Sequence, residues 1–189
     1  MSPKTVMFAA TASIMLALDQ LSKIWVRANL AEHEERSIIP QFLSLAHAKN
    51  KGAAFSALDS FEYRYWVFYA FTAVAVVVIV QGLRQLKSTD RFQSAAMGFI
   101  FSGAIGNFID RVMRGEVTDM VKVYAGMEPL KSWLRANGPG HTNVYPIWNI
   151  ADAAIVIGVS MFAISYWLEK KETVEAPTGK PAAGSAAAE

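Results

Sequence analysis

The chain has 189 residues, 53% of them hydrophobic, and a formal net charge of +2. A soluble domain is typically about 45–50% apolar, so an excess that is concentrated in blocks indicates a membrane protein. The small net charge without an aromatic-interleaved basic patch argues against a nucleic-acid partner, and the absence of cysteine excludes disulfides, a thiol nucleophile and cysteine–zinc sites.

The first apolar stretch runs from Thr5 to Val26, follows Lys4, and is long enough to cross a bilayer. No small-residue cleavage site stands at its far end, so we predict an uncleaved transmembrane helix over 5–26 instead of a signal peptide. Asp19 and Lys23 near that end are spaced i, i+4 and can pair on one helix face. Alternatively, the span ends near Leu18 and both side chains are interfacial.

A polar connection over about 27–65 follows, in which short apolar runs between Ser37 and Ser56 are punctuated by Pro40 and Gly52. This pattern predicts a few short strands. Asn50 begins the run Asn-Lys-Gly-Ala-Ala-Phe, and asparagine followed closely by glycine is ordinary turn chemistry. A hairpin turn is therefore the simple interpretation of this run.

The clearest spanning helix is predicted over 66–86, because Trp66 to Val80 carries no charge and aromatic residues crowd its start as at a membrane interface. Only about six residues separate it from the next apolar segment. The two segments are therefore expected to form a tight helical hairpin with a basic turn.

The third predicted helix, over 92–112, has small residues every fourth position at Gly98, Ser102 and Gly106. Such a stripe lets another helix approach closely. Close packing does not explain the charged and amide side chains that follow, which are Asn107, Asp110 and Arg111. Polar groups that persist within a membrane usually face the bundle interior and are functional.

A second polar connection, over about 113–145, contains an expected strand at Val117–Val123, which includes Asp119. An amphipathic helix over Met127–Asn137 could rest on the membrane surface with Trp133.

The fourth helix is predicted over 146–168, because proline is tolerated at a helix start. Asn149 and Asp152, three residues apart, share a face of it. The tail, 171–189, is rich in Ala, Pro, Gly and Thr and is expected to be disordered.

Four spans place both termini on one side of the membrane. Lys4, the pair Lys170 and Lys171, and the basic hairpin at 84–91 favour the cytoplasm for that side. The polar side chains of the spans then gather near the outer surface; these are Asp19, Lys23, Asn107, Asp110, Arg111, Asn149 and Asp152.

Two carboxylates that face each other in a water-accessible cleft can share one proton, because repulsion raises one apparent pKa. One then removes a proton from water while the other protonates the substrate carbonyl, each contributing about 10²–10⁴-fold in rate. Such a site hydrolyses peptides without a nucleophile or a metal. We expect no metal and no other cofactor, since His33, His47 and His141 are dispersed along the chain.

Other chemistries stay open at this point. Ser22 and Lys23 are adjacent on a helix and point apart, but a Ser–Lys pair from distant positions is possible. Four helices with clustered carboxylates also suit a proton-coupled transporter or an ion channel, although the charges form no path across the bilayer and no inverted repeat is visible. A binding scaffold would leave the intramembrane Asp and Asn groups unexplained.

Five ordered runs make the chain resemble the lipoprotein signal peptidase (type II signal peptidase) family: 19–23 (DQLSK), 50–55 (NKGAAF), 103–111 (GAIGNFIDR), 117–119 (VTD) and 149–152 (NIAD). The resemblance implies an all-α membrane protein with four transmembrane helices and a small extracytoplasmic β-sheet, the cradle. It implies an aspartic peptidase of the bacterial inner membrane, a monomer that contacts membrane lipid. This enzyme cleaves the signal peptide of a diacylglyceryl-modified prolipoprotein before the lipidated cysteine.

The resemblance also implies roles for single residues. Asp119 and Asp152 match the catalytic pair, and Asn50 matches a substrate-contacting loop. The supporting residues and the first-helix motif are matched by Asn107, Asp110, Arg111, Asn149, Asp19 and Lys23.

Two features depart from the family pattern. Ser102 stands where a glycine is common, which is a small-for-small change. The stretch between the two aspartates is unusually long, with the excess at about 126–143, and it could act as a lid over the site.

Overall fold

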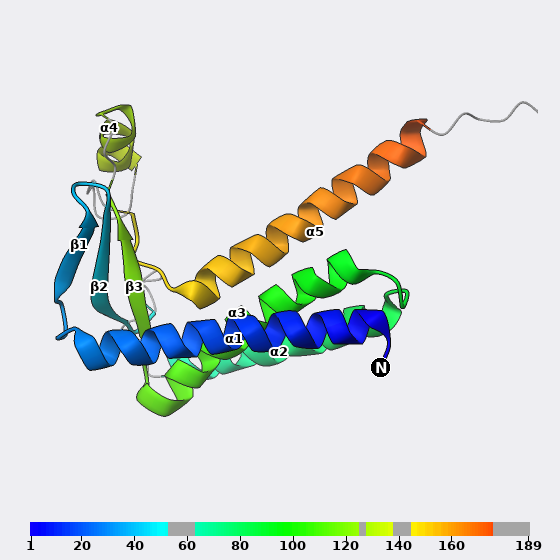
Figure 1. Ribbon diagram of the computed structural model, residues 1–189, viewed down its shortest axis with the longest axis horizontal. Coiled ribbons are helices and arrows are strands. Elements are labelled where there is room, and N and C mark those ends of the chain that lie inside the picture. The colour runs from blue at the N-terminus through cyan, green and yellow to red at the C-terminus, as the bar shows by residue number, and fades with distance from the viewer. Residues whose placement is uncertain (53–62, 125–127, 138–144, 176–189) are drawn as a thin grey trace, which may run out of the picture.

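The computed structural model describes residues 1–52, 63–124, 128–137 and 145–175. It contains five helices and three strands among these residues (Figure 1), in the order α1 (Pro3–Asn29), β1 (Glu35–Ile39), β2 (Leu43–Asn50), α2 (Arg64–Gln85), α3 (Arg91–Arg114), β3 (Val117–Val123), α4 (Glu128–Asn137) and α5 (Ile150–Glu175).

Four of the helices, α1, α2, α3 and α5, are long and apolar enough to cross a membrane, as the sequence predicted. Large apolar side chains point outward from them, and Trp66 and Phe71 of α2 are each 69% exposed. A water-soluble protein would not leave such long helices apolar on their outer faces. A lipid environment explains both the composition and the exposure.

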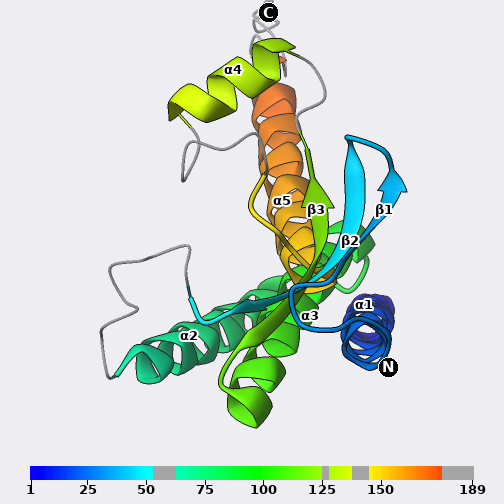
Figure 2. The same cartoon turned by 90° about the vertical axis from the view of Figure 1, so that its left-hand side faces the viewer.

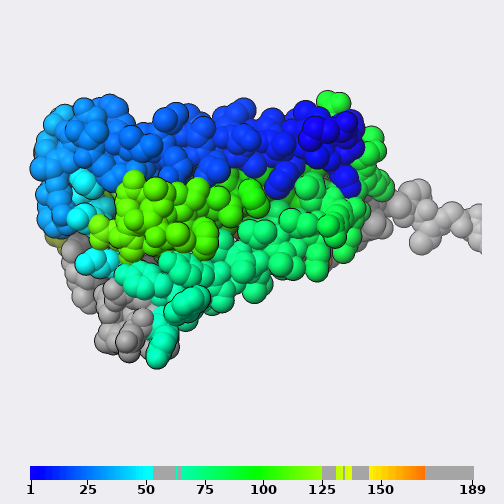
Figure 3. Space-filling view, turned by 90° about the horizontal axis from the view of Figure 1, so that it is seen from below, coloured from blue at the N-terminus to red at the C-terminus, as the bar shows by residue number. Residues whose placement is uncertain are grey.

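Helix α3 lies between its neighbours and packs against α1, α5 and α2. Figure 3 shows α3 seated between α1 and α2. The predicted stripe of small residues makes this close packing possible: a methyl group added at Gly98 would lie 2.9 Å from the backbone oxygen of Phe8 in α1. On another side of α3, Gly103 adjoins the backbone oxygen of Ala151 in α5.

The three strands form an antiparallel sheet in the order β1-β2-β3 at one end of the helices (Figure 2). β3 begins directly after α3, where Gly115 ends the helix in the left-handed conformation with φ of 73°. β2 pairs with β3 so that Ala48 lies opposite Asp119, with an irregularity between Leu45 and Ala48. The sheet therefore holds Asp119 directly beyond the end of α3.

The boundaries of the fourth spanning helix differ from the prediction. α5 begins at Ile150 and not at Pro146, because Trp148 is extended and exchanges backbone hydrogen bonds with Val121 of β3. At its other end, α5 continues to Glu175, so the tail predicted to be disordered from 171 is helical for its first residues. Residues 176–189 lie outside the described part of the chain.

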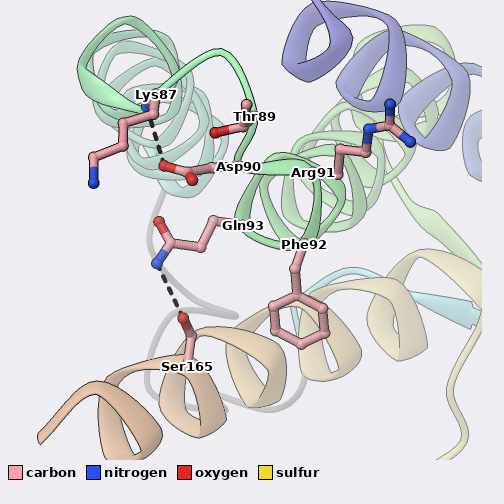
Figure 4. Close-up of a pocket in the computed structure, with 7 residues that line it drawn as sticks. All are labelled: Lys87, Thr89, Asp90, Arg91, Phe92, Gln93 and Ser165. Atoms are coloured by element: carbon pink, nitrogen blue, oxygen red, sulfur yellow. Dashed lines mark hydrogen bonds between the residues drawn. The ribbon is translucent and has the colours of Figure 1, made fainter. Parts of the chain in front are cut away.

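The opposite end of the bundle is held by polar contacts between helices. The ammonium of Lys4 donates to the backbone oxygens of Leu83 and Leu86, which end α2, and Gln93 of α3 donates to Ser165 of α5. Figure 4 shows the pocket beside this last bond, about 670 Å³ in volume and lined by Lys87, Thr89, Asp90, Arg91, Phe92, Gln93 and Ser165. It lies far from the sheet and from the carboxylates described next.

Candidate active site

Asp119 lies in β3 with its carboxylate buried and 2% of the residue exposed. Each carboxylate oxygen accepts one hydrogen bond from a side-chain amide. Asn50, at the end of β2, donates to Oδ2 at 2.9 Å, and Asn149, just before α5, donates to Oδ1 at 2.6 Å. The sheet and the start of α5 therefore fix this carboxylate from two sides.

Asp152 is oriented by the start of its own helix. The Oδ1 of Asn149 accepts the backbone N–H of Asp152 at 3.0 Å, and Oδ2 of Asp152 accepts the backbone N–H of Asn149 at 3.2 Å. This reciprocal pair is a capping box, which satisfies two otherwise unpaired amides of the first turn. The other oxygen, Oδ1, accepts a hydrogen bond from Asn107 of α3 at 2.8 Å. Asp152 is half-buried, whereas Asp119 is buried.

The amides of Asn107 and Asn149 join the two carboxylates into one network. Asn149 Nδ2 donates to both Asp119 and, at 3.2 Å, Asn107 Oδ1. Asn107 in turn donates to Asp152. Asn149 thus contacts both carboxylates, one through its side chain and the other through its backbone N–H.

Behind Asn107 lies a fully buried ion cluster. The ammonium of Lys23 lies 2.9 Å from the carboxylate of Asp19 and 3.2 Å from that of Asp110, and all three residues are at most 1% exposed. Lys23 also donates to Asn107 Oδ1 at 3.0 Å. Because the ammonium has only donors, this bond fixes which end of the Asn107 amide faces Asp152, and the NH₂ group is presented to the carboxylate.

The two acidic residues of the cluster accept hydrogen bonds from the backbone of α5 and of β3. Asp19 accepts the backbone N–H of Ala151, in the first turn of α5, at 2.9 Å. Asp110 accepts the backbone N–H of Thr118, the residue before Asp119, at 3.2 Å. The cluster therefore positions the segments that carry Asp152 and Asp119.

Arg111 differs from the other predicted site residues. Its guanidinium lies 4.3 Å from the ring centroid of Phe68 in α2, over the ring face, and it donates to the backbone oxygen of Asn107 at 3.3 Å. It therefore joins α2 to α3 beside the site. No hydrogen bond from Arg111 to either carboxylate occurs among the described residues.

Burial dominates the electrostatics of Asp119. Loss of water raises the pKa of this carboxyl to about 6, from an ordinary value of 3.8. The hydrogen bonds from Asn50 and Asn149 favour the ionised form and lower the pKa, whereas the charge of Asp152 raises it further. The pKa of Asp119 is therefore shifted toward the operating pH, which is the direction that favours acid–base catalysis.

Sequence reasoning missed one member of the site, Arg27. Arg27 donates to the hydroxyl of Thr118 at 2.9 Å and lies 3.6 Å from the carboxylate of Asp110. The signal was present, because Asp19, Lys23 and Arg27 follow one another at four-residue spacing on α1. Ser22, weighed as a nucleophile beside Lys23, donates instead to the backbone oxygen of Asp19.

The arrangement holds two carboxylates in one hydrogen-bonded network, and carboxylates held in this way can orient a water molecule. Within the described ranges, no group of three or more His, Asp or Glu side chains is placed to hold a metal ion. The side chains that donate hydrogen bonds to the two carboxylates are amides. An amide N–H that is not already hydrogen-bonded within the protein can also bind a substrate carbonyl.

Comparisons with known proteins identify the family to which the chain belongs. A family model described as signal peptidase (SPase) II, Peptidase_A8, matches residues 11–168. A lipoprotein signal peptidase of Geobacter metallireducens is 37% identical over 87% of this chain and 92% of its own length. One from Syntrophotalea carbinolica is 36% identical, over 82% of this chain and 88% of its own.

Solved structures match as well. One described as a bacterial membrane enzyme has a TM-score of 0.69 and 26% identity over 84% of this chain and 91% of its own. A second structure of the same description has a TM-score of 0.70 and 24% identity over 92% of this chain and 93% of its own, which supports the fold. The predicted fold class and family resemblance are thereby confirmed, and the chain belongs to the signal peptidase II family.

Proposed function

We propose that this chain is an aspartic membrane endopeptidase. It cleaves the signal peptide of diacylglyceryl-modified prolipoproteins just before the lipidated cysteine. The family and the name shared by its relatives support the substrate class. The observation that carries the aspartic mechanism is the contact of Asn149 with both carboxylates, which holds Asp119 and Asp152 in one hydrogen-bonded unit.

In this mechanism one carboxylate is ionised and the other holds a proton. The ionised carboxylate removes a proton from water, and the resulting hydroxide attacks the scissile carbonyl carbon. The protonated carboxyl donates its proton toward the carbonyl oxygen. The peptide bond then breaks as the carboxyl that took the proton from water gives it to the leaving nitrogen. Burial of Asp119 and the charge of Asp152 both raise the pKa of Asp119, which favours a state with one proton on the pair.

The position of the pair suits a substrate that is itself in the membrane. Asp152 lies in the first turn of α5, and Asp119 lies in the strand just beyond α3. Both therefore belong at a membrane boundary, where the apolar segment of a signal peptide ends and its cleavage site begins. Membrane lipid and the lipidated precursor are the proposed partners, and the enzyme acts as a monomer.

The proposed topology places both termini in the cytoplasm of a bacterium, with the chain in the inner membrane. Basic residues at the end of the bundle away from the sheet support this orientation; they are Lys4, Arg84, Lys87 and Arg91. The sheet and the carboxylates then lie at the extracytoplasmic face, where a lipoprotein precursor presents its cleavage site. The supporting roles proposed for Asn107, Asp110, Asp19 and Lys23 follow from the hydrogen bonds described above.

The test uses the full chain, purified and reconstituted in lipid vesicles. It is given two forms of one bacterial prolipoprotein, one carrying diacylglycerol on its cysteine and the other unmodified, and the products are identified by mass spectrometry. The proposal requires cleavage of the modified form only, immediately before the lipidated cysteine. Cleavage elsewhere, equal cleavage of both forms, or proton flux across the vesicles without any cleavage would contradict it.

A further inference from the structure

Helix α4 (Glu128–Asn137) is not explained by the proposed chemistry. In Figures 1 and 2 it lies beyond the sheet and away from α1, α2 and α3. Within the described part of the chain, it has no extensive packing against any other helix or strand. An isolated helix of ten residues is only marginally stable in water. Packing against the described elements therefore does not account for its stability, which leaves room for a further stabilising surface.

The sequence of α4 indicates the chemistry of that surface. Leu130, Trp133 and Leu134 follow the i, i+3, i+4 spacing of one apolar helical face. Trp133 is 57% exposed, although tryptophan has a large apolar area to bury. Lys131 and Arg135 give the helix two basic residues against the single acidic Glu128. Aromatic and aliphatic residues beside basic ones are typical of a helix that lies in a membrane interface.

The position of α4 matches this composition. Figure 1 shows that α4 is level, along the axis of α1, with the ends of the spans from which the sheet extends. Those ends mark one boundary of the membrane. The turn between β1 and β2 lies at the same end of the sheet as α4 (Figures 1 and 2). Apolar side chains at and next to this turn are also exposed: Phe42 in the turn is 50% exposed, and Ile38, near the end of β1, is 60% exposed.

We propose that α4 is an interfacial helix that docks onto the lipid leaflet on the side of the sheet. Trp133 enters the boundary between headgroups and acyl chains, and the basic residues face anionic lipid phosphates. The helix thereby holds the distal end of the sheet against the membrane. This inference does not depend on the proposed peptidase activity.

The experiment exploits the absence of cysteine in the chain. Single cysteines are introduced in the full-length protein as Asn137→Cys, one turn after Trp133 on the same face, and as Ser132→Cys on the opposite face. Both native residues are exposed. Each variant is labelled with an environment-sensitive fluorophore and reconstituted in phosphatidylethanolamine–phosphatidylglycerol vesicles that carry a nitroxide-labelled lipid.

The proposal predicts about twofold or stronger quenching by lipid nitroxide at position 137 than at position 132. Adding Trp133→Ala to the Asn137→Cys variant should reduce that quenching, and lowering the phosphatidylglycerol fraction should weaken it. Equal, water-like signals at both positions would overturn the proposal. A label at 137 that is shielded from aqueous iodide but not quenched by lipid would also overturn it, because the helix would then cover protein, as a lid or in a second copy.

Discussion

Asn149 and Asp152 cap one another at the start of α5, through one side chain-to-backbone hydrogen bond in each direction. Capping uses only the oxygen of the Asn149 side chain, so its NH₂ group remains available. That group reaches Asp119 at 2.6 Å. The capping box that begins α5 therefore also positions two carboxylates, far apart in sequence, relative to each other.

The two roles of Asn149 can be separated by substitution. Asn149→Ser keeps an oxygen for the cap but loses the amide donor, whereas Asn149→Ala loses both. We expect both variants to lose about 10²-fold or more in the rate of cleavage, as for loss of a positioned active-site donor. Only Asn149→Ala should also lose about 1 kcal/mol of stability through the cap.

Initial rates and the thermal midpoint in detergent measure these two effects. Full activity in Asn149→Ser would show that the amide donor is not needed. An equal loss of thermal stability in both variants would show that the cap is not what distinguishes them.

The pH dependence should report Asp119. A carboxyl whose folded pKa of about 6 exceeds its ordinary value of 3.8 binds its proton more tightly in the folded protein. Its contribution to stability is therefore complete below pH 3.8 and is lost as the pH rises through about 6. We expect a limb of the activity profile near pH 6, because the protonation state of the pair changes there.

Asn50 provides the matching variant. Its hydrogen bond to Asp119 favours the ionised carboxylate, so Asn50→Ala should raise the pKa of Asp119 and move the limb to higher pH. The measurement is the rate of cleavage of the lipidated precursor by both proteins from pH 4 to about pH 8, which gives the position of the limb in each. A limb that stays in place, or moves to lower pH, would contradict the assignment to Asp119.

The buried ion cluster should be sensitive to removal of its cation. Lys23→Met leaves Asp19 and Asp110 buried without their shared ammonium, which costs about 3–5 kcal/mol when one partner of a buried pair is lost. Lys87→Met, in the α2–α3 turn at the other end of the bundle, is the control and should change stability little. Thermal unfolding of both variants in the same detergent measures the difference, and equal midpoints would refute a stabilising role for the cluster.

Much of this architecture could be predicted from the sequence because it rests on local patterns. Apolar stretches of sufficient length predicted the four spans, and the strand Val117–Val123 was predicted with the bounds that the structure has. The predicted start of the fourth spanning helix, at Pro146, was wrong. Proline is favourable at a helix start, but the backbone of Trp148 pairs with β3, so α5 begins only after this residue. Long-range backbone pairing of this kind leaves no local signal.

The site was less accessible to sequence reasoning. Polar residues at helix ends pointed to one region, and the structure brings Asp19, Lys23, Asn107 and Asp110 into hydrogen-bonding contact there. The sequence could not show that Asn149 bridges the two aspartates, because that depends on the register between β3 and the start of α5. The interaction of Arg27 with Asp110 was missed because Arg27 follows the predicted end of the first span, whereas α1 continues to Asn29.

The small residues of α3 make a prediction about helix packing. Gly103 adjoins the backbone oxygen of Ala151 in α5, so a methyl group there would force the two helices apart. Gly103→Ala should lower both thermal stability and activity, because α5 carries Asp152. Gly115→Ala is the comparison. An added methyl group there would make only ordinary van der Waals contact with Tyr65, 3.5 Å from its hydroxyl oxygen, but it strains a left-handed residue with φ of 73°, and should cost only about 1 kcal/mol. A larger loss at Gly115 than at Gly103 would contradict the packing argument.

The central claim is that Asp119 and Asp152 together perform the hydrolysis. The most direct test compares cleavage of the lipidated precursor by Asp119→Asn, Asp152→Asn and the control Asp90→Asn, which lies in the α2–α3 turn at the opposite end of the bundle. Each active-site variant should lose about 10²–10⁴-fold in rate while its thermal midpoint shows that it is folded, and Asp90→Asn should cleave normally. Wild-type rates in either Asp119→Asn or Asp152→Asn would contradict the account.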